Sequence, residues 1–261
     1  MDAHAIDAWF RLLEWSPADP SWSQRRKATW AWRKFKKARQ WARVLRLVPF
    51  VRMIAIGNAL GYGNCSPESD IDLVIVTAPR RVWTVRLFVV ALLRLFRQRP
   101  GEHDVDAICP SFFLTTEAMD LEPLQIGNSP LSTLHSPLPP DPYLLWWTTQ
   151  LTVLYDKAGT YDAFWRANEQ WVRRWLPDAQ PRAAHPRLCA SNSPTLSVGD
   201  SWVGSAVERW CRRFQERRFS SEVRSLANRD SRVVLTDRML KFHTNDRRQE
   251  YRDRWLEHLC T

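Results

Sequence analysis

The stretch that decides the fold is IGNALGYGNCSPESDIDLVIVT, which runs from Ile56 to Thr77. A Ser-Pro turn leads to two aspartates, Asp70 and Asp72, and the apolar run after them predicts a buried strand. Residues two apart on a strand project from the same face, so the two carboxylates should project together. Neighbouring carboxylates repel each other, and a bound divalent cation is the usual way of keeping both ionised.

The loop before the aspartates contains Gly57, Gly61 and Gly63. Glycine permits close backbone approach and positive φ, and successive backbone N–H groups at a turn can bind an anion. Acid-x-acid doublets also arise by chance in a chain of this composition, so the doublet alone is weak evidence for a functional site. Its combination with a glycine loop indicates a phosphate held beside a metal ion.

The surrounding elements follow from hydrophobic periodicity and turn residues. We expect strands at 51–56, 70–77 and 104–114 and helices at 24–48 and 82–97. Pro110 indicates either a bulge in the third strand or an edge position. This order predicts an α+β core.

A proline-rich segment, SPLSTLHSPLPPDP at 129–142, marks a boundary. Helices are expected after it at 143–155, 161–175, 205–226 and 245–259. We therefore predict an N-terminal helical region at 1–48 packed on the core, a core at 49–128, a connection at 129–142 and a helical C-terminal domain at 143–261.

The charge of the chain is strongly positive and unevenly distributed. Lys and Arg number 38 against 28 Asp and Glu, a net charge of +10, and no acidic residue occurs between Asp19 and Glu68. A basic helix there could follow a nucleic-acid backbone, with tryptophans available for stacking. The alternative is a solvated face. The candidate contacts are Arg33, Lys36, Lys37 and Arg43.

Cysteine usage and hydropathy bear on the compartment. Five scattered cysteines without a CxxC pair favour a reducing cytosol over a disulfide framework or a structural zinc site. The most apolar window, 82–96, is short and contains Arg86 and Arg94, so we expect a buried helix rather than a membrane anchor. The sequence predicts a cytoplasmic protein.

The motif order resembles the nucleotidyltransferase superfamily that includes DNA polymerase β, kanamycin nucleotidyltransferase and the CCA-adding enzymes. Gly57-Asn58 follows an apolar strand, and Asp70-Ile71-Asp72 opens the next one. The segments 48–51, 69–73 and 240–247 also resemble uncharacterised bacterial proteins described as nucleotidyltransferase domain-containing. The resemblance implies a polymerase β-like fold over most of the chain.

In that superfamily a third acidic residue from a later strand completes the metal site. The resemblance therefore implies that Asp70, Asp72 and Asp106 are catalytic and hold two Mg²⁺ ions, with Asp104 as the second choice for the third carboxylate.

The resemblance also implies a phosphate site for the NTP. Gly57, Asn58 and Ser69 would hold the phosphates, although Asn58 stands where the superfamily has Ser or Gly, and Ser69 could instead cap the turn. His243 and Arg247 would contact a triphosphate or base, and His243 could alternatively be a packed residue at a helix start.

The expected activity is transfer of a nucleoside monophosphate from an NTP to an acceptor hydroxyl, with RNA such as tRNA favoured by the positive charge. The same site could serve a protein acceptor, as in AMPylation, or a small molecule. A third possibility is an inactive RNA-binding protein on the same fold.

Overall fold

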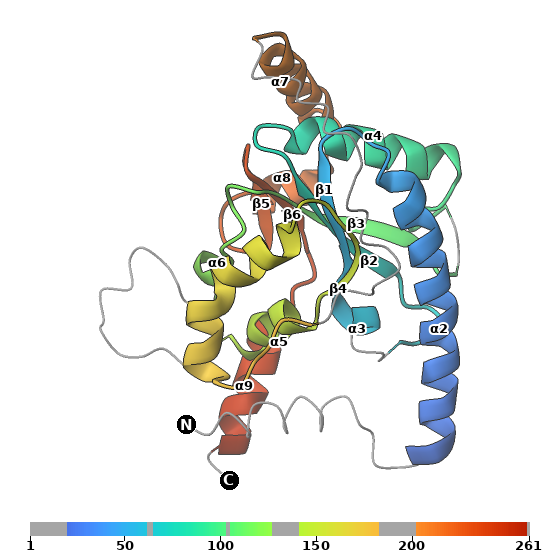
Figure 1. Ribbon diagram of the computed structural model, residues 1–261, viewed down its shortest axis with the longest axis vertical. Helices are drawn as coiled ribbons and strands as arrows, with labels where there is room; N and C mark the ends of the chain where they lie inside the picture. The colour runs from blue at the N-terminus through green and yellow to red at the C-terminus, as the bar shows by residue number, and fades with distance from the viewer. Residues whose placement is uncertain (1–19, 62–64, 103–104, 127–140, 183–201, 260–261) are drawn as a thin grey trace.

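The computed structural model describes residues 20–61, 65–102, 105–126, 141–182 and 202–259. Strands and helices from these ranges form an α+β architecture around a mixed sheet in the order β4-β1-β2-β3-β6-β5 (Figure 1). The α+β class predicted above is thus confirmed.

The sheet combines one parallel pair with antiparallel pairs. β2 and β3 run parallel, and every other neighbouring pair is antiparallel. A parallel pair needs a crossover, which helix α4, Val82–Leu95, supplies between β2 and β3. The strands are β1 Val51–Ile56, β2 Ile71–Thr77, β3 Ile108–Thr115, β4 Thr152–Asp156, β5 Val233–Leu235 and β6 Met239–Phe242.

Helices cover both faces of the sheet. Side chains from α2, Pro20–Leu45, from α4 and from α7, Trp202–Glu216, join one apolar cluster. Side chains from α5, Pro142–Gln150, from α6, Thr160–Trp175, and from α9, Arg248–Leu259, join the other. The shorter elements are α3 Asn58–Gly61, the 3₁₀ turn η1 Glu122–Leu124 and α8 Ser221–Leu226.

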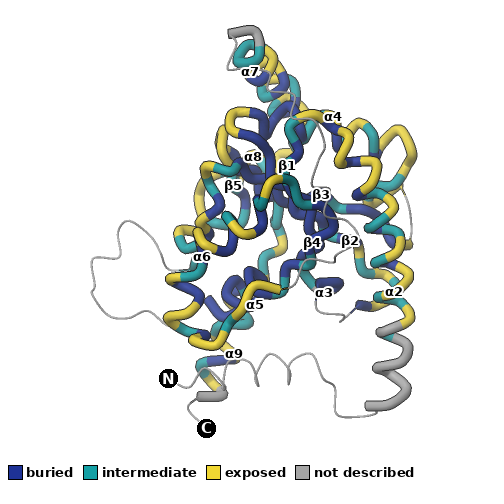
Figure 2. Tube along the Cα trace, in the orientation of Figure 1, coloured by how far each residue is buried: buried dark blue, intermediate teal, exposed yellow. Residues whose placement is uncertain are grey.

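Residues of β2 alternate between these two cores. Leu73 and Ile75 pack toward α2 and α4, whereas Val74 and Val76 pack toward α5 and α6. A strand buried on both faces has a nearly continuous apolar run, which is why the sequence after Asp72 shows no alternation. Figure 2 shows the strands buried between helices whose outer sides are exposed.

The elements predicted for 51–56, 70–77, 82–97 and 161–175 are found within two residues of their expected ends. The bulge predicted at Pro110 is also found, since the register with β2 shifts between Pro110 and Phe112. β3 nevertheless lies inside the sheet, between β2 and β6, and it begins only at Ile108. Most of the proline-rich connection at 129–142 falls outside the described residues.

The region after 143 differs from its predicted helical character. The helix expected at 143–155 ends at Gln150, and β4 follows and pairs antiparallel with β1. The helix expected at 205–226 is divided into α7 and α8, and β5 and β6 were not predicted. Three-, four- and five-residue strands are too short for periodicity to reveal, and their position beside β1 and β3 depends on tertiary pairing.

Phe113 tests the central position of β3. It is fully buried, whereas Phe88 on α4 is 50% exposed. We expect Phe113→Ala to lower the free energy of unfolding by about 3–5 kcal/mol, because a large cavity opens between the sheet and its helices. Phe88→Ala is the matched control and should change it by less than about 1 kcal/mol. Equal losses in urea unfolding would contradict the described core.

Candidate functional site

Asp70 and Asp72 lie at the start of β2. Asp70 is exposed just before the strand, and Asp72 is partly buried within it. Burial raises the pKa of Asp70 above its usual value. Burial also raises the pKa of Asp72 to about 6, and the negative charge of Asp70 adds to that rise, while a hydrogen bond from Asn58 opposes it. The charge of Lys34 opposes the rise for Asp70 only in part, so both carboxyls keep a raised pKa, as expected of a site that a cation would stabilise.

Asn58 connects Asp72 to helix α5. Its Nδ2 donates to Asp72 Oδ2 at 2.8 Å, while its Oδ1 accepts from Trp147 Nε1 at 2.8 Å and from the Tyr143 hydroxyl at 3.1 Å. Asn58 has a φ of 51°, which Asn tolerates better than most residues. These contacts orient the Asp72 carboxylate and occupy the amide that was predicted to bind a phosphate.

Gly57 is needed for close packing against the same tryptophan. A Cβ at Gly57 would lie 3.0 Å from Trp147 Nε1, tighter than ordinary contacts. The Gly57 N–H donates to the Asp72 carbonyl at 3.1 Å, so this amide is also occupied. The described contacts make Gly57 a packing residue between β1, β2 and α5.

Ser69 caps the turn before β2. Its Oγ accepts from the Ser66 N–H at 3.0 Å, as expected for the alternative in which Ser69 caps the turn instead of binding a phosphate. Its carbonyl accepts from Lys34 Nζ at 2.6 Å. Lys34 comes from α2 and is fully buried, so this helix is fixed to the turn that carries the aspartates.

Asp106 is held by α2 rather than by the aspartate pair. Its carboxylate lies 2.5 Å from Lys34 Nζ and 2.7 Å from Arg33 Nε, and the two cations hold its pKa below the usual value against the effect of burial. Asp106 has a φ of 57° and precedes β3. The side chains opposite Asp72 on β3 are Cys109, its register partner, and Ser111, whose Oγ lies 3.4 Å from Asp72 Oδ1.

The metal chemistry open to this site follows from its donor set. In the described ranges, no group of three or more His, Cys, Asp or Glu side chains is placed to hold a metal ion. Mg²⁺ is often bound by one or two carboxylates together with substrate phosphates, and Asp70 with Asp72 fits that pattern for one ion. The second Mg²⁺ ion, which was expected with Asp106, is not supported by this donor set. Asp104, the second choice for the third carboxylate, lies outside the described residues.

A cavity of about 260 Å³ lies beside Asn58, which forms part of its wall. We call it the aromatic pocket. Its wall includes a stacked pair, Tyr143 and Tyr251, with ring centroids 5.3 Å apart, and a second pair, Phe112 and Trp147, at 5.6 Å. Asn58, His243 and Arg247, predicted as nucleotide contacts from distant parts of the sequence, all line this pocket.

Cations of the C-terminal segment complete the pocket. Lys241, Arg247 and Arg248 line it, and Arg247 lies over the Tyr251 ring with its guanidinium carbon 5.8 Å from the centroid. Burial lowers the pKa of Lys241 to about 8. Burial also lowers the pKa of His243 to about 3, so this imidazole is neutral at physiological pH and contributes no charge toward a phosphate.

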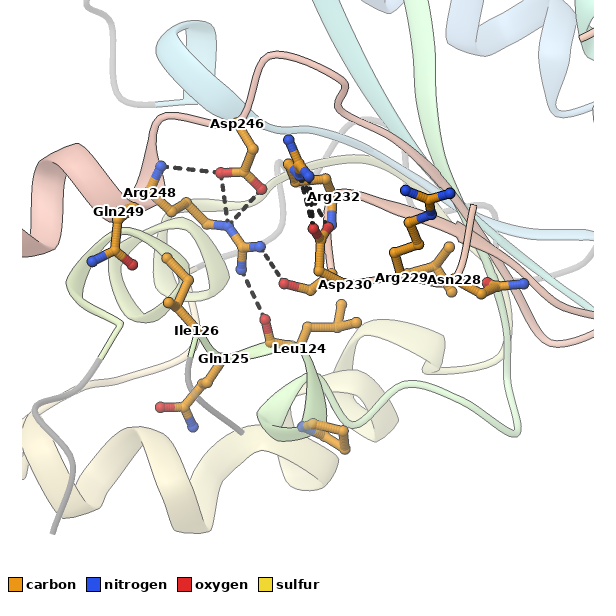
Figure 3. A pocket seen from close by; sticks show the side chains of 13 residues that line it. Leu124, Gln125, Ile126, Asn228, Arg229, Asp230, Arg232, Asp246, Arg248 and Gln249 are labelled. Atoms are coloured by element: carbon orange, nitrogen blue, oxygen red, sulfur yellow. Dashed lines mark hydrogen bonds and ion pairs between the residues drawn. The ribbon is translucent and has the colours of Figure 1, made fainter. Parts of the chain in front are cut away.

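Asp246 and Arg248 belong to a buried ion network and line both the aromatic pocket and a larger cavity of about 540 Å³, whose lining is drawn in Figure 3. Arg248 donates to Asp246, to the Leu124 carbonyl at 2.8 Å and to Asp141 at 3.0 Å, and Lys241 lies 3.3 Å from Asp246. Asp141 caps α5 through the Leu144 N–H. The network thus fixes α5, α9 and β6 relative to one another, and with them the pocket walls.

The predicted nucleic-acid contacts lie along α2. Lys36 and Arg43 are exposed, Lys37 is partly buried, and the Arg33 side chain is 52% exposed while it contacts Asp106. The sequence did not single out Trp147, Tyr143 or Lys34. Trp147 and Tyr143 belong to a helix rich in aromatic residues, and a helix that is merely packed in the core has the same composition. Lys34 is one of many cations in its helix, and no local pattern marks it as the buried one.

Comparison of the chain with protein-family models, with curated proteins and with solved structures found no match. Among the described helices, none combines the length and apolar character needed to cross a bilayer. The described cysteines, Cys65, Cys109 and Cys211, are free.

The raised pKa of Asp72 predicts a pH-dependent stability. An unfolded carboxyl loses its proton near 3.8, whereas the folded one keeps it until about 6. The folded state therefore binds more protons in this window, and its stability falls as pH rises through it. Asp72→Asn should remove this loss and gain about 2 kcal/mol relative to the wild type between pH 4 and pH 7, measured by urea unfolding.

The exposed Asp178 provides the control, because Asp178→Asn changes the same group without burial. Its stability curve should run parallel to the wild type across the range. If the stability curve of Asp72→Asn also ran parallel to that of the wild type, the pKa of Asp72 in the folded protein would be ordinary and the prediction would be wrong.

Proposed function

We propose that this protein is an Mg²⁺-dependent nucleotidyltransferase with a polymerase β-like core, which transfers a nucleoside monophosphate from an NTP to an acceptor hydroxyl. The observation that carries the proposal is the link from Asp72 through Asn58 to the aromatic pocket. It places a candidate cation site beside a cavity whose rings and positive charges suit a nucleotide.

The aromatic pocket would hold the NTP. Aromatic faces stack on nucleobases, and Tyr143, Tyr251 and Trp147 offer such faces. Arg247 lines the pocket, and although its guanidinium is held by Glu250 at 2.7 Å, its remaining N–H groups would pair with phosphate oxygens. The neutral His243 suits a base rather than a phosphate. In this proposal the base lies toward His243, and the phosphates extend toward Asp70 and Asp72.

The chain's own residues would act mainly by positioning. Mg²⁺ bound by Asp70 and Asp72 would neutralise charge on the phosphates. Asn58 keeps the Asp72 carboxylate oriented, and α5 keeps Asn58 in place through Trp147. In the transfer, the acceptor oxygen forms a bond to the α-phosphorus, the bond to pyrophosphate breaks, and the hydroxyl proton passes to a base or solvent.

RNA is the proposed acceptor class. The net charge of +10 and the exposed cations of α2 favour a polyanion over a cationic small molecule. A protein acceptor uses the same chemistry and is distinguished by the product that carries the label.

A second candidate is a nucleotide- and RNA-binding protein without transferase activity. The specific observation for it is Asp106, whose ion pairs with Lys34 and Arg33 direct it away from the pair that it was predicted to complete. Binding would persist in such a protein, and transfer would not.

The experiment is incubation with NTPs labelled at the α-phosphate, Mg²⁺ and total cellular RNA or protein. We expect label in RNA, and Asp70→Ala and Asp72→Ala should each lower it by at least about a hundredfold, because several kcal/mol of charge stabilisation is lost. Asp178→Ala is the matched control and should transfer normally.

Nucleotide binding, followed by tryptophan fluorescence, separates the two candidates. Saturable, Mg²⁺-dependent quenching without label in any acceptor would support the non-catalytic candidate. Label that survives both aspartate substitutions would place the chemistry elsewhere and defeat the proposal.

A further inference from the structure

A further recess lies on the α2 side of the molecule, about 490 Å³ in volume, between α2 and the end of α4. We call it the α2 groove. It is lined by Arg33, Lys36, Lys37, Trp41, Phe96 and Asp106, together with two glutamines. None of these residues lines the aromatic pocket, so the two recesses are separate.

The described residues of the α2 groove carry more positive charge than negative charge. Helix α2 contains no acidic residue, and Asp106, the one carboxylate among the described residues of the groove wall, is already held by Arg33 and Lys34. Lys36 and Lys37 form no ion pair with the described part of the chain. Partial burial lowers the pKa of Lys37, an effect that a bound anion would reverse. The groove is therefore suited to a polyanion.

Exposed aromatic side chains accompany these cations. Phe96 is 56% exposed, and its ring packs edge-on against Trp41 with centroids 5.7 Å apart. Trp32 is 68% exposed and lies one helical turn before Lys36, on the same side of α2. Cations interleaved with exposed rings are the usual platform for single-stranded nucleic acid, whose bases are free to stack. A duplex would leave the rings without bases to contact.

Lys34 links the groove to the aspartate pair. Its Nζ contacts both Asp106 and the Ser69 carbonyl, and its positive charge opposes the rise in the pKa of Asp70. The end of the groove at Asp106 is thus close to the start of β2.

We infer that the α2 groove binds the single-stranded end of an RNA acceptor and directs its terminal hydroxyl toward Asp70. This inference rests on the proposed function for the direction of the hydroxyl, but the binding itself does not require transfer. The site comprises α2 cations and the Trp41–Phe96 ring pair, and its ligand class is single-stranded RNA.

The test is fluorescence anisotropy with a short labelled single-stranded RNA, without NTP. Phe96→Ala should weaken binding about tenfold because a stacking platform is lost. Lys36→Glu should weaken binding further. It should also reduce the slope of log affinity against log salt concentration by the amount that corresponds to about one phosphate contact. Arg166→Glu is the matched control, since Arg166 is an exposed cation on α6, across the sheet, and it should bind like the wild type. Thermal unfolding of each variant verifies folding.

Three results would overturn the inference. One is equal affinity for Phe96→Ala, Lys36→Glu and Arg166→Glu. Another is equal or tighter binding of duplex RNA that is insensitive to Phe96→Ala. The third is stronger binding to vesicles of anionic lipid than to RNA, which would assign the surface to a membrane.

The transfer assay distinguishes this inference from the proposed function. Loss of RNA binding in Phe96→Ala, with no label transferred by the wild type, supports the groove and defeats the transferase. Label transfer to RNA that is unaffected by Phe96→Ala and Lys36→Glu supports the transferase and defeats the groove. Lys36→Glu should in either case leave nucleotide binding in the aromatic pocket unchanged.

Discussion

The hydrogen bond from the Asn58 amide to the Asp72 carboxylate is the contact on which the candidate site depends. A buried carboxylate without a cation is costly, and this bond is the main interaction that offsets the cost. Because the amide oxygen is in turn fixed by Trp147 and Tyr143, the position of the carboxylate is set by helix α5. The aspartate on the sheet and the aromatic wall of the pocket are thereby parts of one rigid arrangement.

A second constraint operates on the opposite side of the sheet. Lys34 is fully buried, and its ammonium reaches the Asp106 carboxylate and two backbone carbonyls, those of Pro67 and Ser69. Breaking a buried ion pair from one side typically costs about 3–5 kcal/mol, so this cluster holds α2 firmly against the turn before β2. It also explains why a basic helix lies near Asp70 without an ion pair to it. The positive charge nearest to Asp70 is already engaged, which leaves the aspartate pair open to an added cation.

The sequence indicated the central elements because their signals were local. The strand at 51–56 was found with its predicted ends, and the strand after Asp70 with a difference of one residue at its start. Of the two alternatives for Pro110, the bulge is found and the edge position is not, since β3 lies inside the sheet and a residue without an N–H there interrupts the ladder. The sequence could not assign the partners of Asn58 and Ser69. An amide or a hydroxyl binds a phosphate and a neighbouring protein group equally well, and its surroundings in the fold determine which of them it binds.

The residue pattern alone was enough for the α+β class and for the buried strand that begins between the two aspartates. These features depend on residue type and on spacing along the chain. Only the tertiary structure decided that Asp106 turns to Lys34, that residues after 143 add strands to the same sheet, and that Asn58, His243 and Arg247 meet around one cavity. The physical reason is that such contacts join residues far apart in the chain, and their geometry depends on how helices and strands pack, which no local pattern records.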